Sequence, residues 1–277
     1  GLLHTALASQ YHNDPKVADT LFITAFEQEQ NPPARLILAA ANHYYRTDRI
    51  DKAINLIKQI KSNEYDNKHL LKLMDKPYVS PIDEISLNSP SEGIGEALFD
   101  IANALRDDFN TNASLIFVRL ALYMRPKYPP AQILLGDLFH DRSKYSQATS
   151  QFEMISENSI FYPMAQYRLS NALKQSSRPK IALDLLENLH RKRPKEPESL
   201  INIGDIHRSQ KKWLDAIIAY SKALELTQNI QKQDWIVFYS RGIAFEQSKQ
   251  WQLAEADFLK ALELSPDQPF VMNYLGY

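Results

Sequence analysis

The chain has 277 residues, a formal net charge of −1 and no cysteine. The lack of cysteine excludes disulfides and thiolate metal sites, and the near-neutral charge disfavours a nucleic-acid partner, which requires a basic stripe. No apolar run reaches the roughly 20 residues that a membrane-spanning helix needs. The composition therefore predicts a protein that binds no nucleic acid and has no membrane span.

Residues 1–67 carry a degenerate repeat of helix pairs. A unit that starts at Ala34 has apolar residues at spacings of three and four, which place them on one face of each of two helices. An earlier unit ends at Pro32 and Pro33, which cannot continue a helix. We interpret this region as N-terminal repeat units of weak signature.

Residues 68–94 interrupt the pattern as an irregular insertion. Asn67–Met74 resembles a short helix, and Pro77, Pro81 and Pro90 then punctuate a polar run. Two interpretations stay open: a segment that caps helix ends between two blocks, or a peptide arm that lies in a groove or recruits a partner. The apolar side chains between residues 75 and 91 predict that this stretch is ordered.

Residues 95–268 repeat clearly, with units that start at residues 95, 129, 163, 197 and 235. Pro129, Pro163 and Pro197 are 34 residues apart, and a fixed period of this size indicates stacked units that bury their apolar faces on one another. The next interval is 38 residues, and we assign the extra residues to Thr227–Asp234. Residues 269–277 look like the start of a truncated further repeat, which suggests a piece of a longer protein.

The unit at Trp235 shows the pattern most clearly. Its key residues are Phe238, Gly242 and Phe245 at positions four, eight and eleven, then Ala254, Phe258, Ala261 and Pro266 at positions 20, 24, 27 and 32. This pattern resembles the tetratricopeptide repeat (TPR). The resemblance implies an all-α fold, a right-handed superhelical solenoid of helix-turn-helix repeats. Gly242, Ala254 and Ala261 would be small where helix backbones approach closely, and Gly136 and Gly204 occupy the same position eight in their units.

The resemblance also implies which side chains face the concave groove, since TPR proteins present certain positions of the first helix of each unit there. An Asn at position nine can donate and accept hydrogen bonds at once, which suits a peptide backbone; an ordinary polar residue on a solvated face is the alternative. The predicted groove residues are Asn42, Tyr45, Phe99, Asn103, Ile133, Asp137, Tyr167, Asn171, Ile201, Asp205 and Tyr239.

Catalytic chemistry has no support in the sequence. There is no glycine-rich phosphate loop and no His-Glu-x-x-His motif. His207 falls at position eleven and is interpreted as a packing residue, and His140 with its neighbouring aspartates is not assigned a metal. Because Tyr167, Ile236 and Ser240 stand where some TPR proteins clamp a chaperone's carboxylate with cations, that ligand is disfavoured too. We predict no catalytic residues, no metal and no cofactor.

The sequence thus favours a non-enzymatic scaffold that binds a peptide or amphipathic helix of a partner protein in the groove. The alternative is a structural protein that associates with itself through an open C-terminal repeat. Ser89–Leu98 and the closing segment from Asp257 are similar to bacterial TPR proteins of poorly defined role. Many of those are exported or tethered, so the localisation leans toward the cell envelope or periplasm, with the cytoplasm left open.

Overall fold

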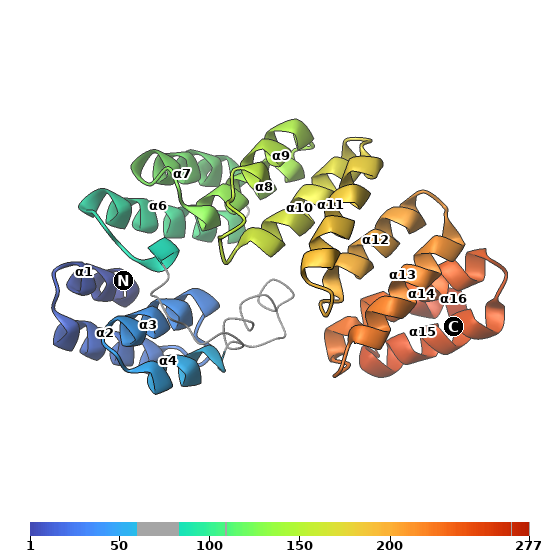
Figure 1. Cartoon of the computed structure of the whole chain (residues 1–277), viewed down its shortest axis with the longest axis horizontal. Coiled ribbons are helices and arrows are strands. Elements are labelled where there is room, and N and C mark those ends of the chain that lie inside the picture. The colour runs from blue at the N-terminus through green and yellow to red at the C-terminus, as the bar shows by residue number, and fades with distance from the viewer. Residues whose placement is uncertain (60–82, 109, 267, 277) are drawn as a thin grey trace. The chain divides into compact units, whose positions relative to one another are not determined.

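The computed structural model describes residues 1–59, 83–108, 110–266 and 268–276, and all of their secondary structure is helical. The predicted short helix Asn67–Met74 and most of the predicted insertion lie outside the described residues. The chain divides into two compact parts, Gly1–Met164 and Ala165–Tyr277, called unit 1 and unit 2 below (Figure 1). The all-α fold predicted from the sequence is confirmed.

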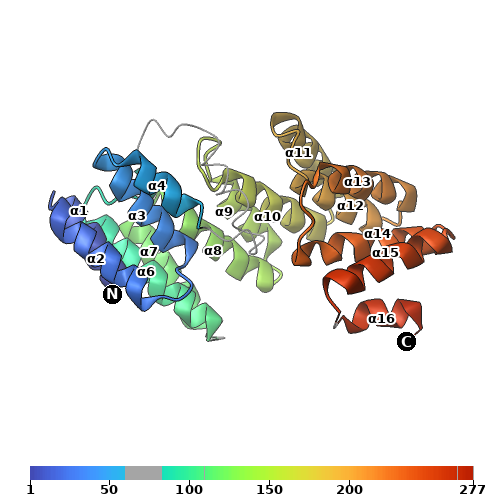
Figure 2. The same cartoon turned by 90° about the horizontal axis from the view of Figure 1, so that it is seen from below.

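The helices follow one another as pairs along each unit, as both views show (Figures 1 and 2). Unit 1 contains α1 (Leu2–Tyr11), α2 (Pro15–Gln28), α3 (Ala34–Arg46), α4 (Ile50–Ile57), the 3-10 turn η3 (Asp83–Ile85), α6 (Pro90–Asp107), α7 (Thr111–Met124), α8 (Pro129–Asp141) and α9 (Tyr145–Glu153). The helix α10 (Tyr162–Gln175) begins at the end of unit 1. Unit 2 continues with α11 (Pro179–Lys192), α12 (Glu198–Ser209), α13 (Trp213–Leu226), η4 (Lys232–Asp234), α14 (Trp235–Gln247), α15 (Trp251–Leu264) and α16 (Pro269–Leu275).

The turn inside each helix pair has a recurring geometry. Position 15 of the units at residues 34, 129, 163, 197 and 235 adopts a left-handed backbone with φ between 57° and 64°, and its occupants are Asp48, Ser143, Ser177, Lys211 and Lys249. The following residue donates its backbone N–H to the carbonyl of position eleven at 2.8–2.9 Å. This bond closes the first helix as a Schellman-type motif does. The five units therefore share one turn, although none of them has glycine there.

Glycine is required instead where the two helices of a pair touch. A Cβ atom on Gly136, Gly204 or Gly242 would lie 2.4–2.6 Å from a ring atom of the aromatic residue at position 24. Those aromatic residues are Phe152, Tyr220 and Phe258, and all are buried. The sequence correctly predicts small residues at these close approaches.

One predicted boundary differs from the structure. Residues 90–94, assigned to the insertion, form the first turns of α6, which begins at Pro90 rather than at Gly95. The Ser89 hydroxyl accepts a hydrogen bond from the Glu92 backbone N–H at 3.2 Å, and Pro90 occupies the first helical position. Both features start a helix. The proline that we interpreted as loop punctuation is therefore a helix N-terminus.

Each unit has its own apolar core. In unit 1 one apolar cluster consists of buried side chains from α1 to α4 together with Ile85 of η3. In unit 2, Phe238, Phe245, Phe258 and Val271 form a cluster between α14, α15 and α16. The first cluster shows that a segment outside the helix pairs contributes to the packing of unit 1.

Candidate partner-binding surfaces

The predicted groove residues of unit 1 are mostly buried. Asn42, Phe99, Ile133 and Asp137 are all less than a tenth exposed, whereas Tyr45 is partly exposed and Asn103 is exposed. Asp137 lies 3.5 Å from the guanidinium of Arg106, and the Phe99 ring packs edge-on against Tyr128. Their contacts within the chain account for much of this burial, and a role in partner binding stays a prediction.

A buried ionic cluster lies beside these positions. The Glu96 side chain is 2 % exposed and accepts hydrogen bonds from Arg125 at 3.0 Å and from the Tyr128 hydroxyl at 2.7 Å. Arg35 also pairs with Glu96 and with Asp100. Because a buried carboxylate is costly unless it is paired and hydrogen-bonded, this cluster fixes α3 and α6 to the end of α7.

A short segment that begins within η3 lies against the same region. We call residues 84–87 the strap. The Ser86 hydroxyl, which is buried, accepts a hydrogen bond from the side-chain amide of Asn42 at 2.8 Å. Arg125 donates to the backbone carbonyls of Glu84 and Ser86, both at 2.9 Å. The described end of the predicted insertion therefore contacts Asn42, one of the predicted groove residues.

The predicted groove residues of unit 2 are more accessible. Tyr167, Asn171, Asp205 and Tyr239 are partly exposed, and Ile201 alone among them is buried. The Tyr167 hydroxyl lies 3.4 Å from the Ser199 hydroxyl on α12, and burial raises the pKa of this tyrosine. Two first helices, α10 and α12, thus meet at Tyr167.

Asp205 and Tyr239 each have partners within unit 2. Asp205 accepts a hydrogen bond from the buried Tyr220 hydroxyl at 2.6 Å, so part of its function is to satisfy that group. The Tyr239 ring lies 5.8 Å from Trp235 and 5.9 Å from Tyr274, measured between ring centroids. Asp205 and Tyr239 therefore contact other residues of unit 2 and also keep part of their surface exposed to solvent.

Glu198 supplies an acceptor that the described residues do not satisfy. It is the first residue of α12 and 8 % exposed, and its Oε2 atom is buried without a hydrogen-bond partner among the described parts of the chain. The helix N-terminus favours its negative charge, and that charge adds to the effect of burial on the pKa of Tyr167. An acceptor left in this state costs free energy unless a donor reaches it.

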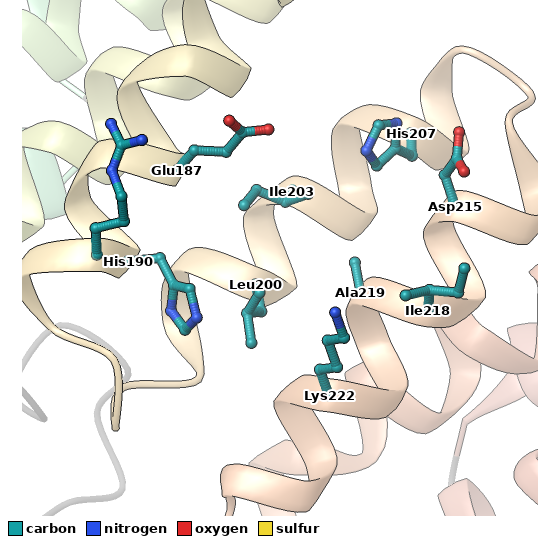
Figure 3. A pocket seen from close by; sticks show the side chains of 10 residues that line it. Glu187, His190, Leu200, Ile203, His207, Asp215, Ile218, Ala219 and Lys222 are labelled. Atoms are coloured by element: carbon teal, nitrogen blue, oxygen red, sulfur yellow. The ribbon is translucent and has the colours of Figure 1, made fainter.

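An open depression of about 560 Å³ lies elsewhere on unit 2, between α11, α12 and α13. Its apolar lining is Leu200, Ile203, Ile218 and Ala219, and its polar lining is Glu187, His190, Arg191, His207, Asp215 and Lys222 (Figure 3). Burial lowers the pKa of His207, whose Nδ1 atom has no partner among the described residues. The repeat pattern gives no sign of this hollow, because it predicts packed side chains at Leu200, Ile203 and His207, which are positions four, seven and eleven of the unit at residue 197.

The described ranges contain neither a metal-ion cluster nor a membrane-spanning helix. No cluster of three or more His, Asp or Glu side chains within residues 1–59, 83–108, 110–266 and 268–276 is arranged to hold a metal ion. No helix in the same ranges combines the length and apolar character needed to cross a bilayer.

The sequence profile of the tetratricopeptide repeat family matches residues 167–229. This segment covers α11, α12 and α13 and most of α10. None of the curated proteins compared with the chain matches it.

Several solved structures share the fold. A thermophilic TPR protein of Thermus thermophilus, TTC0263, is 17 % identical and covers 66 % of this chain and 97 % of its own, with a TM-score of 0.53. Pseudomonas aeruginosa pilF is 12 % identical and covers 88 % and 97 %, with a TM-score of 0.52. MamA from Desulfovibrio magneticus RS-1 is 17 % identical over 66 % and 99 %, with a TM-score of 0.51.

These comparisons establish the fold of the chain. The fold is an all-α solenoid of TPR helix pairs, and residues 167–229 match the TPR family profile. The resemblance drawn from the residue pattern is confirmed. At identities of 12–17 %, the solved structures bear on the fold alone.

Proposed function

We propose that this chain is a non-enzymatic scaffold that binds a peptide or helical segment of a partner protein along the first helices of unit 2. TPR proteins generally mediate protein–protein interactions, which supports the coarser part of this function. The binding surface consists of Tyr167 and Asn171 on α10, Ile201 and Asp205 on α12, and Tyr239 on α14. These residues occupy positions five and nine of successive first helices.

The observation that carries the proposal is the unsatisfied acceptor on Glu198 beside Tyr167. A partner that brings a backbone amide or a cationic side chain to its Oε2 atom would satisfy it, and a charge-assisted hydrogen bond is a strong one. The adjacent Tyr167 ring offers the rigid aromatic area that often anchors a partner. Affinity and orientation would thus come from neighbouring groups on two helices.

Site-specific photo-crosslinking in the native host tests this surface. A photoreactive side chain at position 171 should crosslink to a partner protein, and the same group at Ile181 provides the control. Ile181 is 52 % exposed on α11 of the same unit, so it samples a different face and is more accessible than the partly exposed Asn171. Crosslinks that form at position 181 and not at position 171 would show that the partner uses the other face.

A pair of variants then measures the contribution of the acceptor. Glu198→Gln keeps the size of the side chain but removes its charge, and we expect roughly tenfold weaker binding of the crosslinked partner. Glu187→Gln changes an exposed acidic residue of α11 and should leave the affinity unchanged. Equal affinity for both variants would remove Glu198 from the site.

Self-association is the second candidate, and the exposure of α16 favours it. Phe270 is 66 % exposed and Met272 is 39 % exposed on this short helix, and apolar surface of this kind is typical of contacts between proteins. If α16 mediates association, Phe270→Glu should convert a dimer into a monomer in sedimentation experiments. A wild-type chain that is monomeric at all concentrations would exclude this candidate.

A further inference from the structure

Part of the strap's binding is through its backbone, and these backbone contacts do not depend on its sequence. A single guanidinium nitrogen of Arg125 donates to the carbonyls of Glu84 and Ser86 at 2.9 Å. Arg125 is itself buried, and it lies over the Tyr128 ring at 4.5 Å and pairs with Glu96 at 3.0 Å. Contacts other than those with the strap therefore hold the guanidinium in place, as in a preorganised binding site.

The side chains of the strap each meet a different environment. Glu84 accepts a hydrogen bond from the backbone N–H of Ile160 at 3.2 Å, and Ile85 is 7 % exposed within the apolar cluster. Ser86 accepts from Asn42, and Leu87 packs against the same cluster. Each of the four strap side chains, which are acidic, aliphatic, hydroxyl and aliphatic in that order, thus has a contact that suits its chemistry.

These contacts come from parts of unit 1 that lie 39 to 76 residues from the strap in the sequence. They involve α3, the residue after α7 and the connection before α10. The strap itself belongs to no helix pair. It resembles a short ligand docked on the repeats more closely than it resembles one of their elements.

We infer that the face of unit 1 formed by Asn42, Arg125 and Ile160 is a peptide-binding site whose occupant is the chain's own strap. A partner segment with the same order of acidic, aliphatic, hydroxyl and aliphatic side chains competes with the strap for this face. A tethered occupant acts at an effective concentration on the order of millimolar, so a free segment gains access only when the strap leaves. This site is separate from the unit 2 surface and does not depend on it.

The direct test uses a fluorescent synthetic peptide with the sequence of residues 83–90 and the full chain. Ile85→Asp places a charge in the apolar cluster and should expel the strap, after which the peptide should bind at least about tenfold more tightly than to the wild-type chain. Asn88→Asp adds the same charge to an exposed residue of the same segment and should not increase binding. Fluorescence anisotropy measures all three affinities.

Two further variants examine the recognition. Adding Asn42→Ala to the Ile85→Asp chain removes the hydrogen bond to the serine and should weaken peptide binding by roughly tenfold. A peptide with aspartate in place of its isoleucine should not bind. A folded Ile85→Asp chain that fails to bind the peptide, or that binds it equally well without Asn42, would overturn the inference.

The wild-type chain gives an independent measurement if Ile85→Asp does not fold. Amide hydrogen exchange should show residues 84–87 opening well before α3 and α6, because a docked segment can leave without unfolding the helices. Exchange of the strap only together with global unfolding of unit 1 would mean that it is part of the core, and the inference would be wrong.

Discussion

Unit 1 and unit 2 repeat the same helix pair but use their first helices differently. In unit 1, Asn42 is bonded to Ser86 and Asp137 lies beside Arg106, and both residues are buried. In unit 2, Tyr239 keeps part of its surface exposed, and Glu198 retains an unsatisfied oxygen. The repeat pattern assigns both sets to the same face. The difference is that the strap and the ionic cluster help to bury these residues in unit 1.

The strongest way to break this comparison is to remove the centre of the ionic cluster. Glu96→Leu leaves Arg125 buried without its countercharge, which should cost unit 1 about 3–5 kcal/mol. Hydrogen exchange should therefore increase in α3 and α6 far more than in α14 and α15, since repeats couple mainly to their neighbours.

A surface ion pair in unit 2 is the control for this variant. Lys260 and Glu263 lie 2.7 Å apart with 66 % of the Glu263 side chain exposed, so Glu263→Gln should change stability by less than about 1 kcal/mol. An equal loss of protection in both units after Glu96→Leu would contradict the separation into two units.

A smaller effect is expected from the glycines inside the helix pairs. Gly204→Ala would place a methyl group 2.6 Å from the buried Tyr220 ring, whose hydroxyl is fixed by Asp205. Overpacking of this kind costs about 1–3 kcal/mol, measurable by urea denaturation.

Gly93 provides the matched control on unit 1. It lies near the start of α6, and a Cβ atom there would be 3.5 Å from Leu87, an ordinary contact. Gly93→Ala should therefore stabilise the helix by up to about 1 kcal/mol. Opposite signs for the two variants are the expected result, and a gain in stability from Gly204→Ala would show that the Tyr220 ring can move.

The helix pairs could be predicted from the sequence because their determinants are local. Apolar spacings of three and four define the faces, and the glycine at position eight lies 16 residues before the aromatic ring that it contacts, as with Gly204 and Tyr220. The start of α6 was misjudged because a proline ends one helix or begins another, and here the Ser89 cap determines which. The left-handed turns were not foreseen, since Lys211 and Lys249 carry no signal for such a backbone.

The candidate sites could be predicted only in part. The register identifies Tyr167 and Asn171 as first-helix positions, and both remain partly exposed. It cannot show that the Asn42 amide donates a hydrogen bond to Ser86, 44 residues away, because nothing in the spacing links the two residues. It also cannot show the hollow at His207, which depends on the separation between α11 and α13.

The third prediction concerns a turn that the two units share. Lys249 has φ 64°, a conformation that costs a residue with a Cβ atom about 1–2 kcal/mol. Lys249→Gly removes this strain but increases the freedom of the unfolded chain, so we expect a net gain of up to about 1 kcal/mol. Lys249→Ala keeps the Cβ atom and should give no such gain in thermal denaturation. Asp48 in unit 1 has the same geometry, with φ 57°, and Asp48→Gly should behave alike.

The smallest effect we expect is the pH dependence that His207 gives to unit 2. Burial lowers the pKa of His207 below its ordinary value of 6.5, so the unfolded chain binds more protons than the folded one as the pH falls through 6.5. Stability must then decrease with falling pH in this window. The effect is small because His207 is partly exposed and the solvent screens its charge.

His207→Gln should reduce this pH dependence without abolishing the fold. We would compare urea midpoints at about pH 7.5 and about pH 5, on either side of the ordinary histidine pKa, and follow the exchange of α12 and α13. The matched variant His43→Gln changes a buried histidine of unit 1, whose pKa is also lowered by burial, and should flatten the response of α3 instead. If His207→Gln leaves the pH response of α12 and α13 as steep as in the wild-type chain, the proton uptake belongs to another group.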